Sequence, residues 1–112
     1  MVRRYIPEAG DIVWMHFDPQ AGHEQAGHRP ALVLSPSLYN GKTNLMLCCP
    51  ITTQVKGYPF EVLIAGDYSN AVLADQVKSL DWVAGKANFK GKVSSAELSE
   101  VRAKISALIG KP

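Results

Sequence analysis

Short apolar runs alternate with polar or glycine-containing turns along the first two thirds of the chain. Runs rich in β-branched and aromatic residues cover four segments: 11–17, 31–35, 45–50 and 60–64. Such runs, bounded by turn signals like Asn40-Gly41, are typical of strands. Residues 71–80 add one bent strand or two short ones. Five or six short strands predict a closed barrel or a small sandwich, because closure removes exposed strand edges. Trp14, an alternating position of the first run, is expected in the core.

The last part of the chain has the periodicity of a helix. Ser94 is followed three residues later by Glu97, a spacing typical of a capping box in which both side chains bind backbone amides. Four apolar residues then recur on one helical face: Leu98, Val101, Ile105 and Leu108. Gly110 supplies the stop. The sequence therefore predicts a mainly β fold with a C-terminal α-helix, whose apolar stripe packs on the sheet or on a partner subunit.

Length and composition point to one domain covering residues 1–112, since 112 residues with 46% hydrophobic content suffice for a core. The chain has no apolar run of about 18 residues, so we expect no membrane span. The charged start, without an apolar stretch behind it, predicts no secretory signal. Cys48 and Cys49 are adjacent, and a vicinal disulfide is strained, so we expect free thiols in a reducing cytoplasm.

The net charge of +2 permits nucleic-acid binding without requiring it. Residues 1–60 carry five Lys or Arg against four acidic residues, and residues 61–112 carry seven against six. A protein that binds duplex nucleic acid non-specifically normally has a larger and more concentrated basic excess. Composition therefore indicates a soluble domain and no particular function.

The thirteen residues of segment 18–30 form a long, polar connection between the first two predicted strands. Long connections are usually functional or disordered, and this one concentrates His23, Glu24, Gln25, His28 and Arg29. A solvated loop without a site is an equally good interpretation on composition alone.

Metal-independent RNA cleavage is one chemistry that this segment can support. The reaction needs a group that takes the 2′-hydroxyl proton, a cation for the phosphorane and a donor for the leaving oxygen. Arg29 suits the cation because its planar fork binds phosphate at two points, and His28 and Glu24 can each carry protons. A zinc site is not predicted, because His23 and His28 are five residues apart rather than four.

Three blocks of the sequence resemble the MazF/PemK/Kid family of toxins. They are Glu24-Gln25-Ala26-Gly27-His28-Arg29-Pro30-Ala31 running on to Pro36, Pro50-Ile51-Thr52-Thr53-Gln54 continuing to Val62, and Val72-Leu73-Ala74-Asp75-Gln76-Val77-Lys78-Ser79. The blocks occur in the family's order and at the family's spacing, and the resemblance covers nearly the whole chain.

The resemblance implies a small SH3-like β-barrel with short helices and a long C-terminal helix, assembled as a homodimer. It implies the toxin of a type II toxin-antitoxin system, which cleaves single-stranded messenger RNA at a specific sequence, with an ACA-like triplet expected. The products would carry 2′,3′-cyclic phosphate and 5′-hydroxyl ends. The partner would be a MazE-like antitoxin whose acidic tail occupies the RNA groove, and no cofactor is implied.

The same resemblance assigns roles to individual residues. Arg29 and Thr52 match the family's catalytic arginine and threonine, and Glu24 and His28 match positions that bind RNA or transfer protons. The remaining RNA contacts expected are Gln25, Lys56, Tyr58, Asp75, Gln76 and Lys78. From their chemistry alone, Arg29 in a surface salt bridge and Thr52 capping a turn are open alternatives.

Two other functions remain compatible with the sequence. A toxin of the same fold can act without cutting RNA, on DNA gyrase or another protein target, because fold does not fix function. A purely structural dimer domain is the third possibility, and it leaves the polar composition of segment 18–30 without a role.

Overall fold

The computed structural model describes residues 4–17, 28–64 and 67–110. Within these residues the elements run in the order β1 (Asp11–His16), β2 (His28–Val33), α2 (Ser37–Thr43), β3 (Leu45–Thr52), β4 (Glu61–Ile64), β5 (Asp67–Leu73), β6 (Lys78–Asp81), β7 (Asn88–Lys92) and α3 (Ser95–Ile109).

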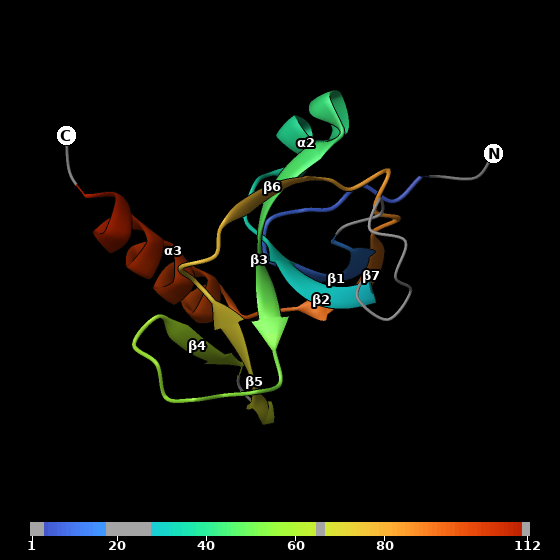
Figure 1. The fold of residues 1–112 in the computed structure, drawn as a ribbon. Coiled ribbons are helices and arrows are strands. Elements are labelled where there is room, and N and C mark those ends of the chain that lie inside the picture. The colour runs from blue at the N-terminus through green and yellow to red at the C-terminus, as the bar shows by residue number, and fades with distance from the viewer. Residues whose placement is uncertain (1–3, 18–27, 65–66, 111–112) are drawn as a thin grey trace.

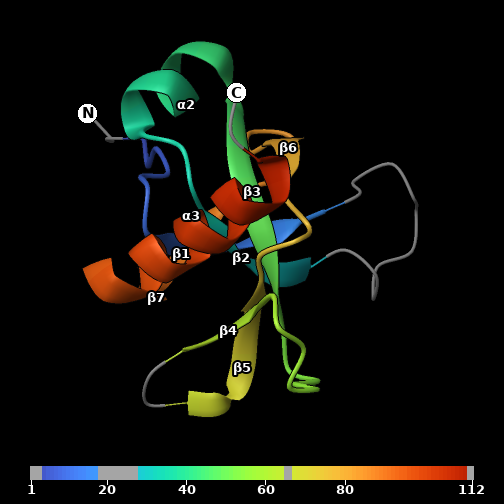
Figure 2. The same ribbon diagram turned by 90° about the vertical axis from the view of Figure 1, so that its left-hand side faces the viewer.

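The strands form one antiparallel sheet in the order β4-β5-β3-β2-β1-β7, and β6 pairs with the first half of β3. The sheet curls into a half-barrel, with α3 lying across one side and α2 at one end (Figure 1). Turned by 90°, the same view shows α3 in front of the central strands (Figure 2). The predicted mainly β fold with a C-terminal helix is confirmed. No described helix is long and apolar enough to cross a membrane.

The central strands β1, β2 and β3 have a hydrophobic core on each face. Successive side chains of a strand point to opposite sides, so each strand contributes to both cores. On one face Ile12, Leu32 and Cys49 pack with Val101 of α3. On the other face Val13, Val33 and Cys48 pack with Trp82. Neighbouring residues therefore lie in different cores.

Cys48 and Cys49 follow this alternation and occupy opposite faces of β3. Both thiols are free and fully buried, as the sequence predicted. Burial raises the pKa of each thiol to about 12, because the apolar surroundings disfavour the thiolate. They are packing residues, one for each core.

Helix α3 begins and ends where the sequence predicts. The Ser94 hydroxyl accepts from the amide of Glu97 at 3.1 Å, and the Glu97 carboxylate accepts from the amide of Ser94 at 2.8 Å. Val101 is fully buried, and Leu98 and Ile105 pack partly buried against the core. The stripe then continues past the sheet, so that Leu108 is half exposed.

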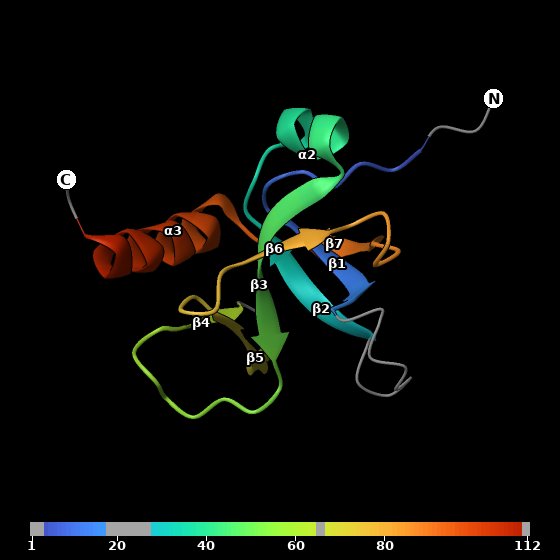
Figure 3. The same ribbon diagram turned by 45° about the horizontal axis from the view of Figure 1, so that its top comes forward.

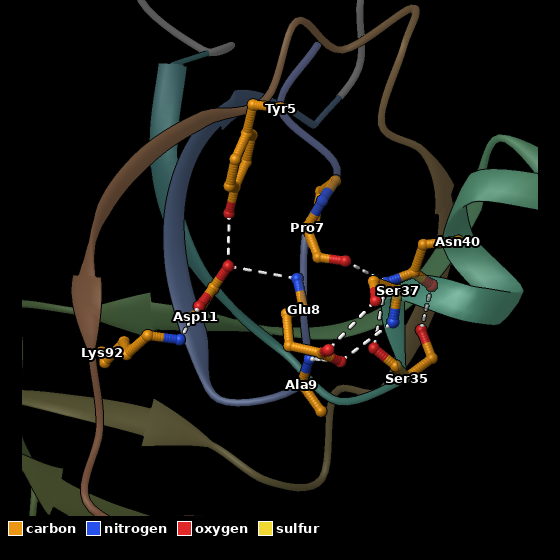
Figure 4. A network of polar contacts seen from close by, with 9 residues as sticks. All are labelled: Tyr5, Pro7, Glu8, Ala9, Asp11, Ser35, Ser37, Asn40 and Lys92. Atoms are coloured by element: carbon orange, nitrogen blue, oxygen red, sulfur yellow. Dashed lines mark hydrogen bonds and ion pairs between the residues drawn. The ribbon is translucent and has the colours of Figure 1, made fainter. Parts of the chain in front are cut away.

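Helix α2 stands where Asn40-Gly41 had predicted a turn. Asn40 is fully buried, and its side-chain amide donates to the carbonyls of Pro7 (2.8 Å) and Ser35 (2.9 Å). Its side-chain oxygen accepts from the Ser35 hydroxyl at 2.6 Å (Figure 4). These tertiary bonds fix Asn40 inside a helix and override its local preference for a turn.

A second part of the same network joins β1 to the segment before it and to the edge strand β7. The buried carboxylate of Asp11 accepts from the Tyr5 hydroxyl at 2.6 Å and forms an ion pair with Lys92 of β7 at 2.6 Å (Figure 4). Burial and this bond to Asp11 raise the pKa of Tyr5 well above its ordinary value. The segment before β1 is thereby fixed against the sheet.

Candidate functional site

Arg29 and Thr52 lie at the same end of the sheet, because β2 begins where its antiparallel neighbour β3 ends (Figure 3). The two strands pair as far as Ala31 opposite Pro50. Beyond that point Thr52 pairs with Ala71 of β5, and Arg29 pairs with Met15 of β1. The two predicted catalytic residues therefore lie on neighbouring strands, toward the same end of the sheet.

Thr52 opens onto a pocket with a volume of about 490 Å³. One wall is the segment between β3 and β4, and the other is the turn that follows β5. The pocket is lined by Thr52, Gln54, Lys56, Tyr58, Glu61, Leu73, Asp75 and Gln76. Five of these eight residues were predicted as site residues from the sequence, although the chain brings them from two separate segments, 52–61 and 73–76.

The two walls of the pocket are joined by hydrogen bonds. The Tyr58 hydroxyl donates to the Asp75 carboxylate at 2.8 Å, and the amide of Ala74 donates to the carbonyl of Phe60 at 2.9 Å. The bond to Asp75 raises the pKa of the exposed Tyr58. The same bond orients the Asp75 carboxylate toward the opposite wall of the pocket.

The Thr52 hydroxyl has both a structural contact and a free chemical function. It accepts from the amide of Gln54 at 3.0 Å, so it does cap the turn that ends β3. A hydroxyl is also a donor, and accepting this bond does not use its own proton. Thr52 can therefore cap the turn and donate to a phosphate oxygen at the same time.

His28 lies apart from Arg29 and Thr52. Its ring stacks on Trp14 of β1, with 5.4 Å between ring centroids and 16° between planes, and His16 lies 5.0 Å away. Adjacent strand residues face opposite sides, so His28 and Arg29 point away from each other. The expectation that Trp14 is in the core was wrong: Ile12 packs in one core and Val13 and Met15 in the other, whereas Trp14 is partly exposed beneath Lys90.

The other predicted site residues have different outcomes. Lys78 is exposed at the start of β6, opposite Cys48 of β3, and does not line the pocket. His28 and Arg29 are the first two residues of strand β2 and do not belong to the preceding loop. Glu24 and Gln25 lie outside the described residues. Among the described residues, no three His, Cys, Asp or Glu side chains gather as a metal site would require.

Glu61 is a pocket residue that the sequence did not reveal. It lines the pocket from the start of β4, and its carboxylate binds backbone amides of the neighbouring wall. A single glutamate before an apolar strand has no motif, and its role depends on backbone amides whose positions only the folded chain defines.

Comparisons with known proteins cover nearly the whole chain. Residues 8–109 match the family model described as PemK-like, MazF-like toxin of type II toxin-antitoxin system. The endoribonuclease toxin MazF of Escherichia coli K12 is 58% identical over 98% of this chain and 100% of its own. A crystal structure of MazF from Deinococcus radiodurans is similar with a TM-score of 0.85 at 50% identity, over 96% of this chain and 100% of that one. A MazE-MazF structure from the same organism has a TM-score of 0.85 at 44% identity, covering 97% and 100%.

Proposed function

The chain belongs to the PemK-like, MazF-like toxin family of type II toxin-antitoxin systems, and we propose that it is an endoribonuclease that cuts single-stranded messenger RNA without a metal ion. One observation carries the proposal: the pocket gathers Thr52, Lys56, Tyr58, Asp75 and Gln76 at the end of β3, and the antiparallel pairing of β2 with β3 brings the start of β2, which holds Arg29, to the same end of the sheet. Relatives of this chain over its full length are named endoribonucleases.

Arg29 and Thr52 are the proposed catalytic residues. Arg29 binds the scissile phosphate through two parallel N–H donors and stabilises the charge of the phosphorane. Thr52 donates its hydroxyl proton to a phosphate oxygen. Attack by the neighbouring 2′-hydroxyl then leaves a 2′,3′-cyclic phosphate and a 5′-hydroxyl. Glu24 and His28 are the proposed proton carriers, which take the proton of the 2′-hydroxyl and supply one to the leaving 5′-oxygen.

The pocket supplies the contacts that select the RNA. Lys56 neutralises a backbone phosphate, and the exposed ring of Tyr58, itself tilted against Phe60, offers a stacking surface for a base. Asp75 and Gln76 present hydrogen-bonding groups to base edges, and an ACA-like triplet is the expected target. Gln25 and Lys78 are the proposed contacts to further nucleotides of the RNA.

The proposed partners follow from family membership. A MazE-like antitoxin would neutralise the chain by covering the RNA-binding surface with an acidic segment. Two copies would form a homodimer in the cytoplasm, with the single domain of residues 1–112 as the subunit.

The test is cleavage of a long unstructured RNA by purified protein in excess EDTA, with the cut ends mapped. We expect cuts at one recurring short sequence, with 5′-hydroxyl ends. A folded protein, free of antitoxin, that leaves this RNA intact would overturn the proposal and favour a protein target such as gyrase.

A further inference from the structure

The segment between β3 and β4 is folded around one carboxylate. Oε1 of Glu61 accepts from the backbone amides of Gly57 at 2.9 Å, Lys56 at 3.2 Å and Tyr58 at 3.2 Å. Oε2 accepts from the amide of Lys56 at 3.1 Å. The amide of Glu61 in turn donates to the Tyr58 carbonyl at 3.0 Å. Three consecutive amides thus converge on a single side chain.

This convergence requires a particular backbone. Gly57 has φ +76°, in the left-handed region that glycine adopts without the steric cost of a Cβ. With Gly57 turned in this way, the amides on either side of it point inward to the same carboxylate, as in other backbone anion sites. The side chains of Lys56 and Tyr58 are left facing the pocket.

A second contact braces the same segment from the helix. The ammonium group of Lys104 in α3 donates to the carbonyl of Pro59 at 2.6 Å. The segment is therefore held at residues 56–58 by Glu61 and at Pro59 by Lys104. Since a carboxylate that accepts several N–H bonds is oriented by them, Glu61 is committed to the backbone and is not the group that moves protons.

We propose that Glu61 is a positioning residue for RNA binding: its carboxylate holds residues 56–58 in the conformation that presents Lys56 and Tyr58 to the RNA. The inference rests on the proposed function, and it adds a residue that acts through the pocket wall without contacting the RNA. Preorganised contacts bind more tightly, because less ordering is required when the ligand arrives.

The test compares Glu61→Gln with the wild type in two measurements. Amide exchange followed by NMR should be at least about tenfold faster at residues 56–58 in the variant, because bonds to an ionised acceptor are the stronger ones. Binding of an RNA oligonucleotide with a 2′-deoxy group at the cut site, which blocks cleavage, should weaken by about tenfold. In cleavage assays KM should rise while kcat stays within about twofold, as expected when only binding is lost.

Glu8→Gln is the matched control. The Glu8 carboxylate also binds backbone amides, those of Ala9 and Ser37 at 2.9 Å each, but it lies beside α2 at the other end of the sheet. It should leave KM and exchange at residues 56–58 unchanged. Should Glu61→Gln melt below the assay temperature, Lys104→Gln carries the same test. Its control is Arg102→Gln, which removes the bond to the Leu34 carbonyl on the same helix.

The outcomes separate the two proposals. Unchanged exchange at residues 56–58, or faster exchange with unchanged RNA affinity, overturns the positioning role while the ribonuclease proposal stands. A wild-type protein that shows the protected amides but neither binds nor cuts RNA overturns the proposed function, and the role of Glu61 in RNA binding falls with it. Faster exchange together with weaker binding supports both.

Discussion

At the scale of single residues, Arg29 is exposed at the start of β2 and lies away from both cores. Arg29→Ala should therefore keep the fold and lower kcat/KM for RNA by about 100-fold or more, the typical loss when a preorganised donor to a developing charge is removed. Arg29→Lys should recover little, because lysine keeps the charge but has no planar fork. Single-turnover cleavage, with circular dichroism melting as the check on folding, measures both effects.

Arg102→Lys is the control for that pair, since Arg102 lies exposed on α3 and bonds only to a backbone carbonyl in the described contacts. It should cut RNA like the wild type. An Arg29→Lys variant within about threefold of the wild type would contradict two-point binding of the phosphate.

The buried thiols make the stability of the protein depend on pH in the alkaline range. Burial raises the pKa of Cys48 from 9.0 to about 12, so the folded state keeps a proton that the unfolded state loses. The contribution of the thiol to the free energy of unfolding should be fully present below pH 9. It should fall as pH rises from 9 towards 12, by about 1.4 kcal/mol per pH unit for each such thiol.

Denaturant titrations at pH 8 and pH 10.5 measure this effect, with Cys48→Ala as the comparison. Tyr5, whose pKa is also raised by burial and by its bond to Asp11, contributes equally to both proteins. The gap in the free energy of unfolding between the wild type and Cys48→Ala should therefore be smaller at pH 10.5 than at pH 8. A gap that stays constant would mean that Cys48 ionises alike in the folded and unfolded states.

The resemblance to the toxin family singled out five residues that line one pocket, because its blocks are continuous, as in the segment from Thr52 to Tyr58. Sequence patterns failed where a role depends on a neighbour in space. Trp14 was expected in the core because it alternates with buried positions of β1, but its ring instead contacts His28 and Lys90, whose positions only the folded chain defines. Glu61 was missed because its partners are backbone amides, which have no sequence signature.

At the scale of elements, the capping box of α3 contributes measurably to stability. Ser94→Ala removes the acceptor for the Glu97 amide and should cost about 1 kcal/mol, the usual effect of losing an N-cap side chain. Thermal melting should show a fall of a few degrees. Ser95→Ala, one residue further on, leaves the box intact and should melt within about a degree of the wild type. Equal melting of the two variants would contradict a stabilising cap.

Long, periodic elements could be predicted and short, polar ones could not. Helix α3 and the apolar strands have strong local patterns, whereas β7 consists of Asn88-Phe89-Lys90-Gly91-Lys92 and becomes a strand by pairing with β1. Helix α2 has seven residues and includes Asn40-Gly41. Its stability comes from the buried bonds of Asn40, which no window of sequence contains.

At the scale of the whole molecule, the proposed homodimer would bury some of the exposed apolar side chains of α2, β3 and α3. Leu38 of α2 is 70% exposed and Ile109 of α3 is 79% exposed, and Leu45 and Leu47 of β3 are also exposed. Leu38→Glu combined with Ile109→Glu should raise the dimer dissociation constant on the order of 100-fold, because each charge would be buried without a partner. Analytical ultracentrifugation over a dilution series measures it.

Phe89→Glu is the control for the dimer variant. Phe89 is 52% exposed, but it lies on the edge strand β7, opposite Val13 of β1, and its ring packs against Tyr5. It should dimerise like the wild type. A dimer that tolerates the double glutamate change and is broken by Phe89→Glu would place the interface on β7 instead.

The pairing of β1 with β7 joins Asp11 to Lys92, 81 positions later in the chain. During synthesis on the ribosome, β1 emerges early and keeps one edge open until β7 follows. An open edge is a template for pairing with other chains, and such distant contacts form slowly. Translation that stops before Asn88 therefore leaves an incomplete sheet. For the proposed ribonuclease, the sheet that carries the candidate site is therefore complete only after β7 has been translated.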